Sequence, residues 1–147
     1  MRLSLFNILV RAIVLLTAIP FHEAAHAYVS DKLGDPTAKN LGRMTLNPAA
    51  HFDLMGAACM LLTGIGWAKP VPVNTYNFDD RKKGMAISAA AGPLSNVLLA
   101  FLSLIAAKIV FYAASGAVGA VSGTLFTLFS TMASINISLA IFNLLPI

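Results

Sequence analysis

Charged residues are scarce in this chain of 147 residues: Asp, Glu, Lys and Arg make up 11% of it, and hydrophobic residues make up 58%. None of these charged residues, and no His, occurs from Gly84 to Ala107 or from Ile109 to Ile147. Each uncharged run exceeds the roughly 20 residues that span a bilayer core. The scarcity of charge excludes a soluble domain and predicts one membrane domain over residues 1–147, embedded in the lipid bilayer.

Cysteine is almost absent as well. Cys59 is the only cysteine, which excludes an internal disulfide and a cysteine-rich zinc site. A cleaved signal peptide is not favoured, because the N-terminal apolar segment carries Arg11 in its middle and has no small-residue cleavage site. The net charge of +4 comes from loops near a membrane surface. Nothing in the sequence indicates a nucleic-acid partner.

Three apolar segments predict spanning helices, and together they predict an all-α membrane protein with a three-helix core. These segments cover about residues 3–28, 85–112 and 124–143. Between residues 29 and 83 the sequence is polar and interrupted by Gly and Pro. Pro20 lies inside the first segment, where we expect it to loosen one helical turn.

Two stretches of the polar middle segment are not expected to form membrane-spanning helices. The apolar stretch from Leu54 to Thr63 is too short to cross a bilayer, so we expect a re-entrant or interfacial segment. Pro70 and Pro72 alternate in Val-rich sequence, which favours an exposed edge strand and excludes a central one. The middle segment should therefore lie at one end of the helices.

The distribution of basic residues predicts the topology. Seven of the ten Lys and Arg residues lie between Val29 and Lys83, and the turn at residues 113–123 has none. The positive-inside rule therefore places the middle segment in the cytoplasm. We expect a multi-pass protein of the cell membrane whose residues His26, Gly92 and Asn143 meet at the cytoplasmic side.

Residues His22, Glu23 and His26 form an H-E-x-x-H pattern, and Glu23 is the only glutamate in the chain. Two histidines four residues apart lie on one face of a helix, so both imidazoles can bind one cation. Glu23 projects toward the same side and can act as the general base. The plain alternative is a set of polar residues lining a bundle, but burying them there costs several kcal/mol. Metal binding removes that cost, so we predict one Zn²⁺ at His22 and His26, with Glu23 catalytic.

Two amides near the expected cytoplasmic helix ends are candidate substrate-binding residues. Asn96 follows a run of small residues, and it could bind a peptide backbone, the loop beside the metal or a neighbouring helix. Asn143 precedes Pro146, and it could bind substrate or simply belong to a helix terminus.

Several separate blocks of this sequence resemble the site-2 protease family of intramembrane zinc metalloproteases, and they occur in the family's order over nearly the whole chain. The blocks are 21–27 (FHEAAHA), 34–39 (GDPTAK), 42–48 (GRMTLNP), His51 with Asp53, 66–74 (GWAKPVPVN), 92–96 (GPLSN) and 143–146 (NLLP). The resemblance implies a three-helix catalytic core, one zinc ion per chain, and hydrolysis of membrane-embedded protein substrates near the cytoplasmic face.

The resemblance also implies a third zinc ligand. In the family, the block beginning Asn-x-x-Pro runs on to an Asp-Gly whose aspartate binds zinc. We expect this ligand beyond Ile147, so the domain is interpreted as C-terminally incomplete. His51 or Asp53 could substitute only if the middle segment folded back over the metal. Otherwise they serve loop hydrogen bonds, with Asp53 as the N-cap of a short helix from Leu54.

Two other classes compete with the protease interpretation. A metal transporter or metal-binding membrane protein should spread polar ligands along a path across the bilayer. After Asn96, however, Lys108 is the only ionisable side chain apart from tyrosines. A catalytically inactive homologue would tolerate loss of Glu23, which is present, although the missing third ligand keeps this class open.

Overall fold

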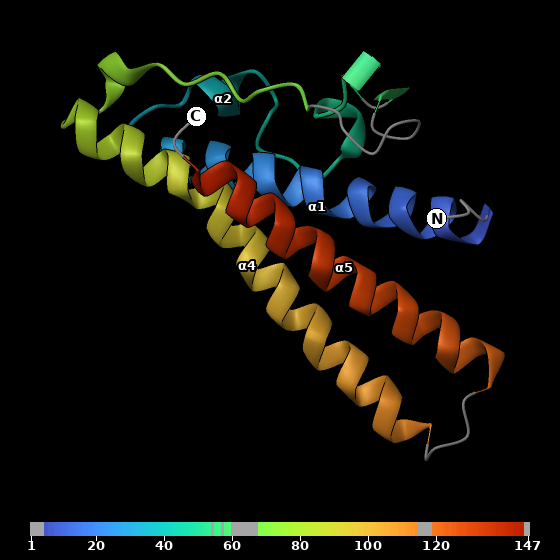
Figure 1. Cartoon of the computed structure of the whole chain (residues 1–147). Coiled ribbons are helices and arrows are strands. Elements are labelled where there is room, and N and C mark those ends of the chain that lie inside the picture. Colours follow the sequence, from blue (N-terminus) through green and yellow to red (C-terminus); the bar gives the residue numbers. More distant parts are fainter. Residues whose placement is uncertain (1–4, 54, 57, 60–67, 115–118, 146–147) are drawn as a thin grey trace.

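The computed structural model describes residues 5–53, 55–56, 58–59, 68–114 and 119–145. Three long helices dominate it: α1 (Leu5–Lys32), α4 (Arg81–Ala113) and α5 (Ala120–Leu144) (Figure 1). All three are long and apolar enough to cross a membrane. The predicted all-α architecture, with three helices that could span a membrane, is therefore confirmed.

The helices extend further into the polar middle segment than the sequence pattern predicts. Helix α1 continues beyond Tyr28 to Lys32, and α4 begins at Arg81 rather than near Met85. The earlier start of α4 has a local cause, because the Asp80 side chain accepts a hydrogen bond from the backbone N–H of Lys83 at 3.0 Å. The predicted start of the first helix, near residue 3, lies outside the described residues.

Small residues set the packing of the three helices. Helices α4 and α5 form an antiparallel pair, and α1 crosses them near one end (Figure 1). The buried positions of α4 are mostly small, and small residues let helix backbones approach closely. They are Gly84, Ser88, Ala91, Gly92, Pro93, Asn96, Ala100, Ser103 and Ala107. Helix α1 is continuous through Pro20.

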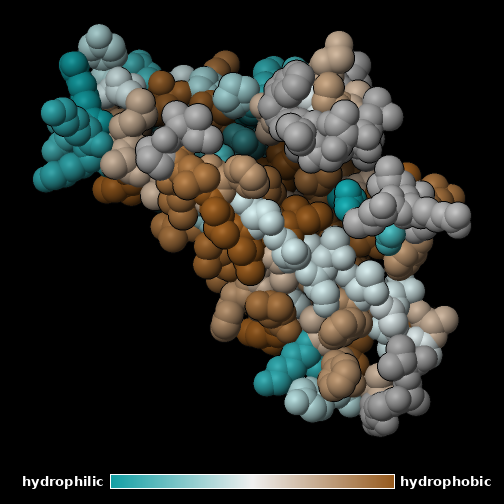
Figure 2. Space-filling model, in the orientation of Figure 1, coloured by the Kyte–Doolittle hydropathy of each residue, from teal (hydrophilic) through white to brown (hydrophobic). Residues whose placement is uncertain are grey.

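Charged and apolar surfaces separate along the molecule. Hydrophobic side chains dominate the visible middle of α4, hydrophilic ones gather near the end where α4 begins, and a hydrophilic side chain interrupts the apolar surface near its far end (Figure 2). Exposed leucine and phenylalanine on α4 include Leu98, 58% exposed, and Phe101, 60% exposed. Such surfaces are stable facing lipid, so this separation favours a membrane boundary near the start of α4.

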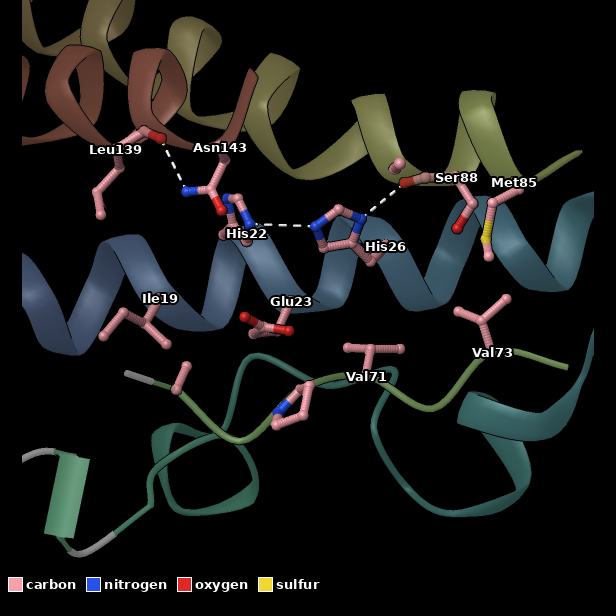
Figure 3. A pocket seen from close by; sticks show the side chains of 13 residues that line it. Ile19, His22, Glu23, His26, Val71, Val73, Met85, Ser88, Leu139 and Asn143 are labelled. Carbon is pink, nitrogen blue, oxygen red and sulfur yellow. Dashed lines mark hydrogen bonds between the residues drawn. The ribbon is translucent and has the colours of Figure 1, made fainter. Parts of the chain in front are cut away.

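The middle segment lies over α1 at that polar end, as expected (Figure 1). Its short elements are α2 (Thr37–Asn40), η1 (Pro48–Ala50) and η2 (Thr75–Asn77). Residues 69–74, here called the covering segment, run extended beside α1 (Figure 3). No strand forms among the described residues, only an isolated antiparallel bridge between Phe52 and Ala68. The predicted edge strand is thus an extended segment without a ladder, because Pro70 and Pro72 supply no N–H donors.

Two further predictions concern residues 53–63. Residues 54, 57 and 60–63 lie outside the described residues, so the re-entrant segment stays a prediction. The Asp53 carboxylate accepts a hydrogen bond from the backbone N–H of Gly56 at 2.9 Å. This is the N-cap bond expected for a helix starting near Leu54.

Asp35 ties the middle segment to the end of α1. Its side chain is fully buried and accepts hydrogen bonds from the backbone N–H groups of Thr37 and Asn74 at 3.1 and 2.7 Å. It also accepts one from Asn77 Nδ2 at 2.8 Å. Burial alone would raise the pKa of the Asp35 carboxyl, but these bonds and one from the Thr37 hydroxyl outweigh it and lower the pKa.

Replacing Asp35 by Asn should lower the free energy of local unfolding of residues 74–77 by about 1–3 kcal/mol at neutral pH, because an amide cannot accept all these hydrogen bonds. The folded pKa lies below the unfolded value of about 3.9, so the carboxylate's stabilisation is complete above that value. It is lost as pH falls through the folded pKa. Hydrogen exchange of residues 74–77 should therefore differ between parent and variant at pH 7 and converge in acid. The exposed Asp79→Asn variant is the control, and equal exchange at pH 7 would contradict the anchor.

Candidate metal centre

His22 and His26 lie on consecutive turns of α1, and their rings point toward one another (Figure 3). The two Nε2 atoms are 3.1 Å apart, and the ring centroids are 4.7 Å apart. Two imidazole nitrogens bound to one tetrahedral zinc, each at about 2.0–2.1 Å, lie about 3.3 Å apart. The observed spacing is therefore close to that of a ligand pair, as the i, i+4 pattern predicts.

Helix α4 orients His26 through its other ring nitrogen. His26 Nδ1 lies 2.6 Å from the backbone carbonyl oxygen of Ser88, which can only accept, so Nδ1 carries the proton. The Nε2 lone pair of His26 is thereby left free to bind a cation. The hydroxyl of Ser88 in turn hydrogen-bonds Ser30 of α1 at 2.7 Å, which fixes α4 against α1.

Asn96, also on α4, contacts the corresponding ring nitrogen of His22. The side-chain amide of Asn96 lies 3.0 Å from His22 Nδ1, with its nitrogen as the donor. Asn96 Oδ1 is buried and has no hydrogen-bond partner among the described residues. A half-turn of the amide lets Oδ1 accept the Nδ1–H of His22, which frees the Nε2 lone pair. The orphaned oxygen thus fits a site in which both imidazoles bind a metal.

Gly92 provides the space in which the two rings meet. A Cβ atom at this position would lie 2.6 Å from His22 Nε2 and closer still to His26 Nε2. No side chain larger than hydrogen fits without displacing the imidazoles. The sequence pattern indicated neither this role of Gly92 nor the contact of Ser88 with His26. Ser88, Gly92 and Asn96 recur every four residues on α4, so they share one face of that helix. His22 and His26 on α1 have the same spacing, and this shared period is the sequence signal for the face of α4 that meets them.

A cavity of about 480 Å³ opens beside the two histidines. Glu23 reaches into the space between α1 and the covering segment (Figure 3). The Glu23 side chain is largely buried, and both the Arg43 guanidinium and the Val71 backbone N–H act on its carboxyl group. The cavity is lined by Ile19, His22, Glu23, His26, Ala68, Pro70, Val71, Val73, Met85, Ser88, Ala89, Leu139 and Asn143.

The two amides predicted to bind substrate lie in different places. Asn143 lines the cavity from α5, and its Nδ2 donates to the Leu139 carbonyl at 2.8 Å. Asn96 is fully buried behind His22 and does not line the cavity. Its position agrees with the alternative of a hydrogen bond between helices, and its role in substrate binding stays a prediction. A role for Asn143 in substrate binding stays a prediction.

The third ligand is not found among the residues that the structure describes, where no group of three or more His, Cys, Asp or Glu is placed to hold a metal. His51 is fully buried and its Nε2–H donates to the Thr45 carbonyl at 2.7 Å. Neither His51 nor Asp53 lines the cavity. The alternative that one of them replaces the third ligand is therefore not supported, and both serve loop hydrogen bonds.

Fold and site together define a helical protein, compatible with several membrane crossings, that carries a candidate metal centre between α1 and α4. The chain is 41% identical over 145 residues to a Bacillus subtilis (strain 168) protein named "Putative zinc metalloprotease YwhC". The similarity covers 99% of this chain and 65% of that protein's length. No family model and no solved structure matches the chain.

The Gly92→Ala variant should lower zinc affinity by about tenfold or more, because its methyl group displaces both imidazoles from their meeting point. Gly119→Ala is the matched control, since a Cβ there meets nothing within 4 Å. Competition with a chromogenic chelator measures the affinity, and circular dichroism checks that both variants keep the helices. Unchanged affinity in Gly92→Ala would contradict a metal bound between the rings.

Proposed function

We propose that this chain is the catalytic core of a zinc metalloendopeptidase that hydrolyses membrane-embedded protein substrates, as the site-2 protease family does. The observation that carries the proposal is the convergence of two oriented imidazoles beside a buried carboxylate in an open cavity. The name of the B. subtilis relative supports a zinc-dependent peptidase. Because the chain spans 65% of that relative's length, the activity of the whole protein is part of the proposal.

The residues of the site fit zinc, which supplies Lewis-acid chemistry by acidifying water and polarising a carbonyl group. His22 and His26 would hold the ion as neutral ligands, and the aspartate that the site-2 protease resemblance implies would complete the set. Glu23 takes the proton from the attacking water and returns it to the leaving amine. His22, Glu23 and His26 all line the same cavity.

The substrate has to be extended before its peptide bonds can react, because a helix keeps its carbonyls in internal hydrogen bonds. The covering segment offers extended backbone along one wall of the cavity, with N–H donors at Val71 and Val73. A peptide that pairs with this backbone lies between it and α1. Asn143 binds the peptide backbone from α5. Water and substrate reach the site from the polar end, which we place at the cytoplasmic face.

A metal-binding membrane protein without peptidase activity is the second candidate. It is favoured by the lack of a third ligand among the described residues. Transport is less well supported, since between Lys83 and Leu145 Lys108 is the one Asp, Glu, Lys, Arg or His side chain. The two candidates differ in what Glu23 does, because metal binding alone does not require a general base.

Replacing Glu23 by Gln should leave zinc binding intact and lower peptide hydrolysis by a factor of about 100 or more, because the amide cannot accept the proton. The assay uses protein extended beyond Ile147 in liposomes with a mixture of single-span membrane peptides, and mass spectrometry identifies the products. The His22→Ala variant should lose both zinc and hydrolysis. Cleavage by Glu23→Gln at the parent rate would refute the general-base role.

A chain extended beyond Ile147 to include the aspartate that the resemblance implies should bind zinc much more tightly than the 147-residue chain. A third ligand adds a bond and completes the usual set of a catalytic site. Equilibrium dialysis compares the 147-residue chain with the extended one, and His26→Ala in the extended chain is the control. Equal affinities of the two chains would favour the metal-binding alternative.

A further inference from the structure

Arg43 is a buried charged residue that the proposed mechanism leaves unused. Its side chain is 6% exposed, and its Nη2 donates a hydrogen bond to the backbone carbonyl of Lys69. The preceding Gly42 has a φ of +69°, and the Arg43 N–H then donates to the Ala38 carbonyl at 2.9 Å. This left-handed turn directs the arginine inward. Burying a guanidinium is costly, so its contacts have to compensate.

Arg43 and its neighbours fix the first residue of the covering segment from two sides. The Lys69 carbonyl accepts from Arg43, and the Lys69 N–H donates to the backbone carbonyl of His51 at 2.9 Å. His51 is itself held by its bond to Thr45. Burial lowers the pKa of the His51 imidazole, so this ring stays neutral near the arginine at neutral pH. Lys69 is therefore anchored immediately before the chain reaches the cavity.

The far end of the covering segment is anchored separately, where the Asn74 N–H donates to the buried Asp35 carboxylate. Between these anchors, residues 70–73 make no backbone–backbone hydrogen bond with any described residue. Pro70, Val71 and Val73 nevertheless line the cavity. The position of this stretch thus depends on its two ends, one held by a cation and the other by an anion.

The same guanidinium is close enough for its charge to act on Glu23, and so is the backbone N–H of Val71. The contact of Arg43 with the Lys69 carbonyl fixes the covering segment where it enters the cavity. We propose that Arg43 is a positioning residue, which holds the covering segment across the cavity. Any effect of Arg43 on catalysis rests on the proposed peptidase function, but its effect on the position of the covering segment does not.

Hydrogen exchange of the backbone amides of Lys69 and Val71 tests the placement in the zinc-loaded protein in lipid nanodiscs. The Arg43→Gln variant should raise their exchange by about tenfold or more, because a buried charge-assisted hydrogen bond is lost. Arg43→Lys keeps the charge and one donor, so it should restore part of the protection. Arg81→Gln makes the same change at an exposed arginine, and exchange of the two amides should stay at the parent value. Unchanged exchange in Arg43→Gln would overturn the proposal.

A second set of variants separates positioning from simple charge compensation. If Arg43 only neutralised Glu23, replacing both residues by Gln would restore the protection of the covering segment. We expect instead that exchange rises as much when Arg43→Gln is made in the Glu23→Gln background. Loss of the effect in that background would overturn the proposal.

Both sets of hydrogen-exchange measurements are independent of catalysis. If the protein lacks peptidase activity, the proposed function is refuted, but hydrogen exchange still decides whether Arg43 positions the covering segment. If Arg43→Gln disrupts the fold, α4 and α5 will also exchange faster. The Arg43→Lys variant then decides: protection of the Lys69 and Val71 amides above that of Arg43→Gln supports positioning, and equal loss overturns it.

Discussion

The two imidazoles of α1 meet at one point only because α4 comes close enough to hold them there. Each ring nitrogen that faces away from the meeting point is bound by a group of α4, the Ser88 carbonyl or the Asn96 amide. The meeting point itself needs the missing side chain of Gly92. The close contact of α1 with α4 is therefore the constraint on which the rest of the site depends. It requires small residues along α4, and these leave little apolar side-chain area buried between the helices.

Buried polar groups have to be satisfied within the protein, and here they bind each other across helices. The pair Ser30 and Ser88 joins α1 to α4, and the Asn96 amide joins the same two helices beside the candidate metal centre. Outside the helices, buried Arg43 and Asp35 hold the covering segment by its ends. Each of these charged side chains binds a backbone group of the covering segment, which forms no regular ladder. The covering segment therefore keeps its place along the cavity without the hydrogen bonds of a sheet.

Peptide hydrolysis at membrane depth needs water and an extended substrate where lipid supplies neither. A cavity at the polar end of the helices, bounded by α1, α5 and the covering segment, answers both requirements. The proposed enzyme differs from a soluble metalloprotease in one respect that matters physically. Its metal ligands come from a helix that is otherwise apolar, so the surrounding residues must admit water to the site while α1 still faces lipid elsewhere.

Much of this protein follows from its sequence, because two kinds of pattern are local. Three long apolar segments predicted three long helices, and the i, i+4 spacing of His22 and His26 predicted that their rings would converge. Helix ends were less predictable, since α4 starts at a capping bond of Asp80 within charged sequence. Roles that depend on residues distant in the chain were decided by tertiary structure alone. Asn96 faces a ring 74 positions away, and Arg43 binds a carbonyl 26 positions away. No periodicity encodes such contacts, because they arise only when separate helices and loops pack together.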